Sequence, residues 1–233
     1  MVWPRYLAYF IGATLLIAFL TQLEVAYPGS LKLHILVNPS DQYGTSEFSP
    51  IEFIQLIIIV ACGALMLWVA EYCPSQRPIA IPFGALALAC FIRELDYFLD
   101  RFLIDNLWQV LIGFPAAFVI VYSYRVRRRF KIAWVRIWPS PATAFFFAGA
   151  LILFSFVQFV GHEPLWMSIL GDNYVRAAKL AIEEFIELLG YMLWLIGSIE
   201  YAYEARAIAY KEPVPIAQRL RERRRRLKWG KPG

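Results

Sequence analysis

Residues 51–70 of the chain read IEFIQLIIIVACGALMLWVA, and this stretch decides the fold class. Its only charged side chain is Glu52, which lies close to its start. The hydrocarbon core of a bilayer is about 30 Å thick, and a helix of about 20 apolar residues crosses it. The stretch therefore predicts a transmembrane helix.

Other stretches of similar length and apolar character occur along the chain. Together with residues 51–70, the expected spans are residues 6–23, 79–98, 107–124, 142–160 and 177–202. The composition agrees, because 60% of the 233 residues are hydrophobic, against about 45–50% in soluble domains. We therefore expect an all-α, polytopic integral membrane bundle of six transmembrane helices that occupies residues 1–210.

Basic residues are unevenly distributed between the two expected sides of the membrane. With six spans, both termini and the loops after the second and fourth spans share one side. That side would hold 18 of the 23 Lys and Arg residues but only five of the 18 acidic residues. Cytoplasmic loops carry an excess of Lys and Arg. The sequence therefore predicts cytoplasmic N and C termini in a multi-pass protein of the cell inner (plasma) membrane.

Two basic segments lie on the expected cytoplasmic side. Residues 125–136 are expected to form a loop, and residues 211–233 a basic tail that contains RLRERRRRLK at 219–228. Near a membrane surface, each cation is attracted to anionic headgroups by about 1 kcal/mol. A lipid bilayer with anionic headgroups is thus the expected partner of the tail. No nucleic-acid partner is expected, because neither segment resembles a base-reading module.

Ionisable residues interrupt two of the expected spans. Such groups are costly in lipid, and they usually face a protein partner, a water-filled cavity or a ligand. The third span runs outwards and the sixth runs inwards, so both groups fall towards the outer leaflet. We expect them to meet in one ligand-binding pocket. Its candidate residues are Arg93, Glu94 and Asp96 from the third span, with Lys179, Glu183, Glu184 and Glu187 from the sixth.

Helical spacing predicts how these charges pair. Lys179, Glu183 and Glu187 follow one face of the sixth span at intervals of four residues. Lys179 can therefore pair with Glu183, while Arg93 can reach Glu183 or Glu187 from the third span. Gly190 continues the same face deeper into the membrane, where a small residue allows another helix to approach closely.

A divalent metal ion is the one cofactor that the sequence suggests. Glu184-x-x-Glu187 resembles half of a di-iron helix motif, and His162 is expected on the same outer side. The repeated Glu-x-x-His signature and any His-x-x-x-His pair are missing. His162, Glu184 and Glu187 are thus a candidate metal set, and a histidine at the membrane interface without a metal is the alternative.

Three functions remain open at this point. In the first, the acidic cluster binds a cation, protons or a small polar solute, as a transport protein would. In the second, the same carboxylates serve a membrane-embedded enzyme that acts on a lipid or lipid-linked substrate. In the third, the chain is a non-catalytic accessory or assembly protein, and its charges form an ion-pair network that only fixes helix packing. Whether the chain is an enzyme stays open.

Overall fold

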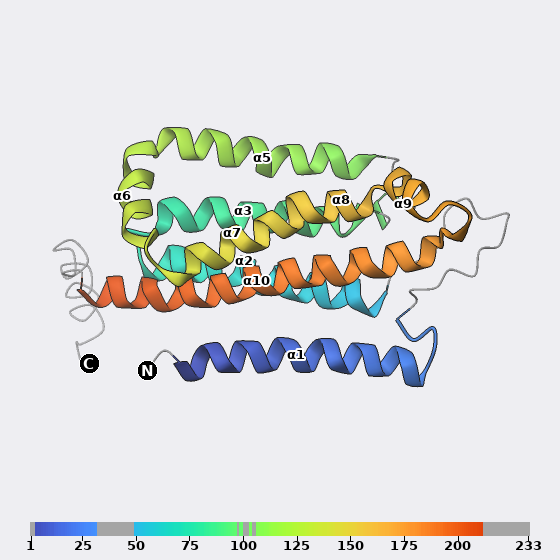
Figure 1. Cartoon of the computed structure of the whole chain (residues 1–233). Helices are drawn as coiled ribbons and strands as arrows, with labels where there is room; N and C mark the ends of the chain where they lie inside the picture. Colours follow the sequence, from blue (N-terminus) through green and yellow to red (C-terminus); the bar gives the residue numbers. More distant parts are fainter. Residues whose placement is uncertain (1–2, 32–48, 97, 100–102, 104–105, 212–233) are drawn as a thin grey trace, which may run out of the picture.

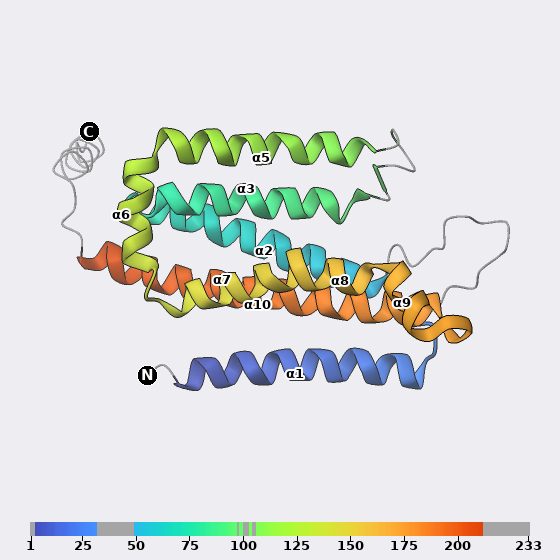
Figure 2. The ribbon, with the colours of Figure 1, turned by 45° about the horizontal axis from the view of Figure 1, so that its top comes forward.

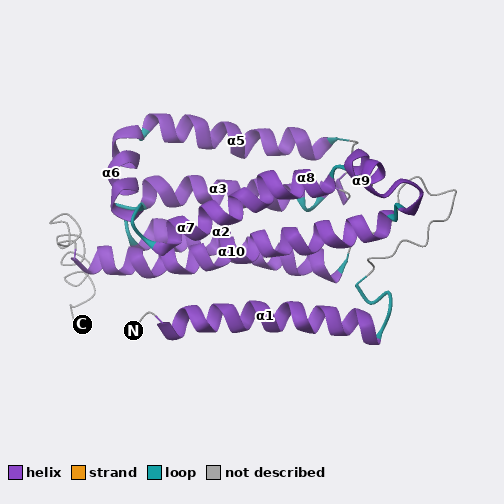
Figure 3. Cartoon of the chain, in the orientation of Figure 1, coloured by secondary structure: helices purple, strands orange, loops and turns teal. Residues whose placement is uncertain are grey.

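The computed structural model describes residues 3–31, 49–96, 98–99, 103 and 106–211, so the basic tail beyond Lys211 lies outside the described residues. Within these ranges the chain consists of helices joined by turns and short loops, without a strand (Figure 3). The expected all-α class is therefore confirmed. The elements are α1 (Trp3–Ala26), α2 (Pro50–Tyr72), α3 (Arg77–Arg93), α5 (Leu107–Arg125), α6 (Arg127–Ile137), α7 (Pro141–Leu151), the π-helix η1 (Ile152–Phe156), α8 (Val157–Gly161), α9 (Glu163–Leu170), the short 3-10 turn η2 (Gly171–Asn173) and α10 (Arg176–Lys211).

Four helical segments are long and apolar enough to cross a membrane. They are α1, α2, α5 and the continuous segment Pro141–Gly161, which comprises α7, η1 and α8. α3 is shorter, with 17 residues. α10 is longer, with 36 residues, but acidic side chains lower its hydropathy. Both nevertheless run alongside the four apolar segments (Figures 1 and 2).

α10 lies at the centre of the bundle. It packs against α2 on one side and α7 on the other, and α3 packs between α2 and α5. α6 crosses one end of the bundle, where α1 begins and α10 ends, and α9 lies at the opposite end (Figure 1). α1 makes few backbone contacts with the other helices. Longer side chains bridge this gap, and Leu20 is almost completely buried.

Glycines bring α10 close to the α7–η1–α8 segment. A Cβ atom on Gly149 would collide with the ring of Trp194, and one on Gly190 would lie 2.6 Å from Leu153 Cγ. The expectation that Gly190 permits close helix approach is therefore confirmed. The π-helix η1 starts at this contact; such single π turns often occur at functional sites.

The third predicted span was wrong at its outer end. Its expected range reached residue 98, but the α-helix ends at Arg93, and a turn follows at Glu94 and Leu95. No Gly or Pro marks this end in the sequence. It coincides instead with polar contacts from Arg93 and Glu94 to α10.

The expected cytoplasmic loop at 125–136 was also wrong in its local structure, because residues 127–137 form the helix α6. Ala133 and Ile137 are buried against the bundle, and Phe130 and Trp134 pack beside them. These four positions recur every three or four residues, which is the pattern of an amphipathic helix. The dense run of arginines concealed this pattern.

Candidate functional site

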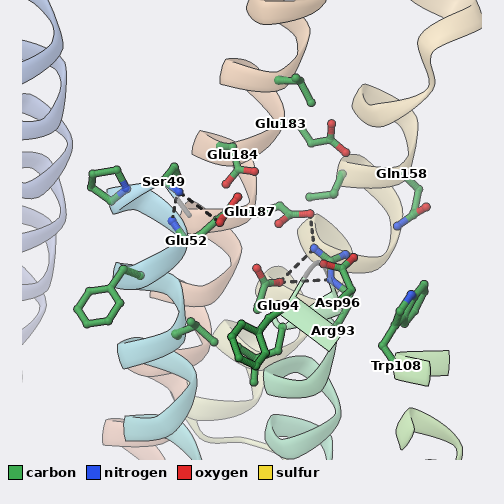
Figure 4. Close-up of a pocket in the computed structure, with 17 residues that line it drawn as sticks. Ser49, Glu52, Arg93, Glu94, Asp96, Trp108, Gln158, Glu183, Glu184 and Glu187 are labelled. Atoms are coloured by element: carbon green, nitrogen blue, oxygen red, sulfur yellow. Dashed lines mark hydrogen bonds and ion pairs between the residues drawn. The ribbon is translucent and has the colours of Figure 1, made fainter. Parts of the chain in front are cut away.

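A pocket of about 1010 Å³ lies near the end of the bundle that carries α9 (Figure 4). Its walls come from the first turns of α2, α5 and α10, from the residues that follow α3, and from α8. Arg93 is the one basic residue in the described lining. The acidic lining residues are Glu52, Glu94, Asp96, Glu183, Glu184 and Glu187.

The charges of the two predicted groups pair across and along the helices. Arg93 Nη2 lies 2.5 Å from Glu187 Oε1 and 3.2 Å from Glu94 Oε1. Lys179 Nζ lies 2.6 Å from Glu183 Oε2, one turn further along α10. The predicted ion pair of Lys179 with Glu183 is therefore confirmed. Arg93 was expected to pair with Glu183 or Glu187, and it pairs with Glu187.

A tyrosine completes the link between α3 and α10. Tyr191 Oη donates a hydrogen bond of 2.7 Å to Glu94 Oε1. Tyr191 and Glu187 are one helical turn apart on α10, and both are buried. The contacts of Glu94 with Tyr191 and of Glu187 with Arg93 therefore hold the end of α3 against α10. No sequence pattern pointed to Tyr191, since a tyrosine within an apolar stretch has many roles.

Glu184 differs from its neighbours because no cation offsets its charge. Gln55 Nε2 donates to the backbone carbonyl of Glu184 at 3.1 Å and to its Oε2 at 3.3 Å. Among the described residues, no Lys or Arg lies within ion-pair distance of this carboxyl group. The charged groups that act on it are the carboxyl groups of Glu52, Glu94, Glu183 and Glu187.

A capping box positions Glu52, which sequence reasoning did not place in the site. Ser49 Oγ accepts a hydrogen bond of 3.0 Å from Glu52 N, and Ser49 N donates to Glu52 Oε2 at 3.3 Å. Pro50 occupies the first helical turn, where its missing N–H does no harm. The Ser-x-x-Glu spacing at 49–52 is recognisable in the sequence as a helix start. This pattern predicts a helix cap and does not indicate that Glu52 lines a pocket.

Aromatic side chains also line the pocket. Phe53, Phe98 and Trp108 line the pocket, and Trp108 stands near Arg93 and Asp96 in Figure 4. The volume lies at the upper end of the range for small-molecule sites, about 300–1,000 Å³. Aromatic faces attract cations through the ring quadrupole. The arrangement can therefore hold a molecule larger than a bare ion.

The residues of the predicted metal set are only partly brought together. Glu184 and Glu187 line the pocket, whereas His162 caps the start of α9 and is not among the described lining residues. No group of three or more His, Cys, Asp or Glu side chains in the described ranges is arranged to hold a metal ion. The divalent ion stays a prediction from the sequence.

A second polar cluster lies towards the other end of α10. Arg5 Nε is 2.6 Å from Glu200 Oε1, and Tyr9 Oη donates to the same oxygen at 2.8 Å. Glu200 is only 3% exposed. This cluster, which we call the Glu200 cluster, joins α1 to α10 with one carboxylate and one guanidinium.

Comparison with protein-family models, curated proteins and solved structures gives no match to this chain. Its function therefore has to be inferred from the geometry and charge of the pocket. The decisive features are the excess of carboxyl groups over cations, the volume, and the aromatic wall.

Proposed function

We propose that the protein spans the inner membrane six times and binds an organic cation in its acidic pocket, as part of a transport function. One observation carries this proposal. The described lining holds six carboxyl side chains and one arginine, with Lys179 as the further cation paired to Glu183. A bound cation would offset the charge of Glu184, which has no Lys or Arg within ion-pair distance among the described residues.

Helix lengths and positions support six spans. At 1.5 Å per residue, α3 is roughly 25 Å long and α10 roughly 54 Å long, so both suffice for most or all of a bilayer core. Both lie beside apolar helices of full length. α6, with its arginines, lies at the end where α1 starts and α10 stops. Because cytoplasmic segments carry an excess of basic residues, we propose that this end lies in the cytoplasm and that the acidic pocket lies towards the outer side.

An organic cation fits the pocket better than a bare metal ion. The described residues do not provide a compact metal-binding group, and the volume of about 1010 Å³ far exceeds that of an ion. Carboxylates beside the aromatic wall of Phe53, Phe98 and Trp108 match an ammonium or guanidinium group carried on an organic body.

Glu184 is the residue that favours a ligand-binding role for the pocket over a role in helix packing alone. If the charges served packing alone, a cationic partner would be expected for the half-buried carboxyl group of Glu184 as well, because an unpaired charge removed from water is costly. Glu187 has such a partner in Arg93. Glu184 instead lines the cavity beside other carboxyl groups. We therefore assign Glu184 as the main anionic contact of the ligand.

Calorimetry on the purified protein in detergent tests the proposal. The probes are benzylamine, benzamidine, tetraethylammonium and Ca²⁺, with benzoate as the anionic control. At least one organic cation should bind. Because a hydrogen bond to a charged group contributes about 1.5–3 kcal/mol, Glu184→Gln should weaken that binding by roughly 10- to 100-fold.

Glu204→Gln is the matched control, since Glu204 lies on α10 but outside the described pocket lining. It should leave affinity unchanged. Binding of benzoate with equal affinity, or no effect of Glu184→Gln, would reject a cation site. Uptake of the bound amine into proteoliposomes then tests the transport part separately, and its failure would leave a binding protein without transport.

A further inference from the structure

A second cavity lies towards the end of the bundle that α6 crosses. Its volume is about 190 Å³. It opens between α3 and α7, two helices that have almost no backbone contact with each other. Apolar side chains make up nearly all of its wall, and the described lining consists of Ile79, Phe83, Leu86, Trp134, Ile137, Thr143, Phe146, Phe147, Ala150, Phe154, Trp194 and Tyr201.

Three polar side chains in this wall already have hydrogen-bond partners. Thr143 Oγ1 donates to the backbone carbonyl of Ile137 at 2.9 Å. Tyr201 Oη donates to Gln76 at 3.2 Å, and Trp194 Nε1 donates to the carbonyl of Phe146 at 3.1 Å. A water molecule needs several polar partners, and these three groups are already engaged. The cavity therefore suits an apolar occupant.

α6 contributes apolar side chains to this cavity and carries exposed basic residues along the same helix. Trp134 and Ile137 line the cavity itself. Arg128, Arg129 and Lys131 are exposed on the same 11-residue helix. Ile132, Val135 and Trp138 are exposed as well. An amphipathic helix rich in arginine that also exposes apolar residues is typical of a helix lying in the membrane interface.

We propose that an anionic phospholipid binds at this place, with one acyl chain in the cavity and its phosphate-bearing headgroup at the basic residues of α6. The apolar cavity and the exposed basic residues of the adjoining helix α6 match the two ends of such a lipid. Basic sites between transmembrane helices on the cytoplasmic side are a known way to hold anionic headgroups. The site is separate from the acidic pocket and does not depend on the ligand that binds there.

Quenching of tryptophan fluorescence by brominated lipids tests this site, because Trp134 and Trp194 line the cavity. The full chain is reconstituted with phosphatidylglycerol or phosphatidylcholine, each brominated on its acyl chains, at equal mole fractions in unbrominated phosphatidylcholine. Brominated phosphatidylglycerol should quench at least twofold more strongly. The variant Arg128→Gln/Arg129→Gln/Lys131→Gln should remove this difference, and so should Ala150→Phe, which fills the cavity.

Two control variants separate a built site from general attraction. Arg224→Gln/Arg225→Gln/Arg226→Gln removes three cations from the tail, and Ala117→Phe adds a ring to an exposed position on α5. Both should retain the difference between the two lipids. Equal quenching by both lipids in the unaltered protein overturns the proposal. The proposal is also overturned if the tail variant loses the difference in quenching between the two lipids as fully as the α6 variant does. If Ala150→Phe fails to fold, these two charge variants decide the question.

Discussion

The two polar clusters on α10 differ in charge balance. In the Glu200 cluster, one carboxylate meets one guanidinium, and a tyrosine donates a further hydrogen bond. In the acidic pocket, six carboxyl groups face one lining arginine. Glu200 is almost completely buried, whereas the acidic residues line a volume of about 1010 Å³.

This difference gives a criterion for telling a structural ion pair from a binding site. Both clusters bear the cost of removing charge from water. The Glu200 cluster offsets it within the protein and thereby attaches α1 to the bundle. In the acidic pocket, Glu184 has no described Lys or Arg within ion-pair distance and lies beside a cavity, and the proposal of a cationic ligand rests on this difference. Within the pocket, Glu187 is paired with Arg93, as Glu200 is with Arg5. Glu184 has no such partner among the described residues, and we propose that it contacts the ligand.

The largest effect is expected from Arg93→Met. The change leaves Glu94 and Glu187 without their cation, and breaking a buried pair costs about 3–5 kcal/mol. Since the Arg93 side chain is 33% exposed, we expect a loss of about 3 kcal/mol in the free energy of unfolding in detergent micelles, near the lower end for such pairs. Arg176→Met, at the exposed start of α10, is the control. Equal stability of the two variants would show that the pair does not hold α3 to α10.

Glu187→Gln and Glu184→Gln should separate stability from binding. Glu187→Gln weakens a charge-assisted bond to Arg93 and should lower the free energy of unfolding by about 2 kcal/mol. Glu184→Gln removes charge repulsion and should leave the protein as stable or more stable. Thermal unfolding of both variants without ligand measures this. The reverse order of stability would mean that Glu184 is the structural carboxylate.

Gly149→Ala tests the close contact of α7 with α10 between the two clusters. The new Cβ would strike the Trp194 ring and lie 2.9 Å from the carbonyl oxygen of Gly190. Overpacking of this kind costs about 1–3 kcal/mol. Gly113→Ala is the control, because a Cβ there meets no atom within 4 Å. Chemical unfolding of both variants gives the comparison; no loss for Gly149→Ala would mean that the helices separate easily.

The smallest effect is expected from Glu200→Gln. Glutamine can still accept hydrogen bonds from Tyr9 and Arg5, and Arg5 is 29% exposed to solvent. We expect a loss of about 1 kcal/mol and unchanged affinity for the organic cation. Calorimetry and thermal unfolding on one sample measure both. Weaker cation binding in this variant would contradict the division between the two clusters.

The sequence was sufficient to predict the helical class and the meeting of two charged groups. Apolar runs of about 20 residues leave few alternatives to membrane helices. The depth of each charged group follows from the order of the spans, so Arg93 and Glu187 were expected near each other, and they form an ion pair. The spacing of Lys179 and Glu183 along one helix also predicted their contact.

Other parts of the pocket depend on which helices become neighbours, and single-residue patterns do not contain that information. Glu52 and Gln55 join the acidic groups because α2 packs beside α10. The end of α3 is determined by contacts of Glu94 with Tyr191, without a Gly or Pro signal. The helix α6 was hidden because its charged residues outnumber the apolar ones that pack on the bundle.

The most direct test of the acidic pocket is a crystal structure of the protein soaked with 4-bromobenzylamine, recorded at the bromine absorption edge. We predict an anomalous peak inside the pocket beside Trp108 or Phe53, with the ammonium group within hydrogen-bond distance of Glu184. The peak should disappear in crystals of Glu184→Gln. Bromine found only among detergent molecules, or a pocket occupied equally in the variant, would contradict a cation-binding function.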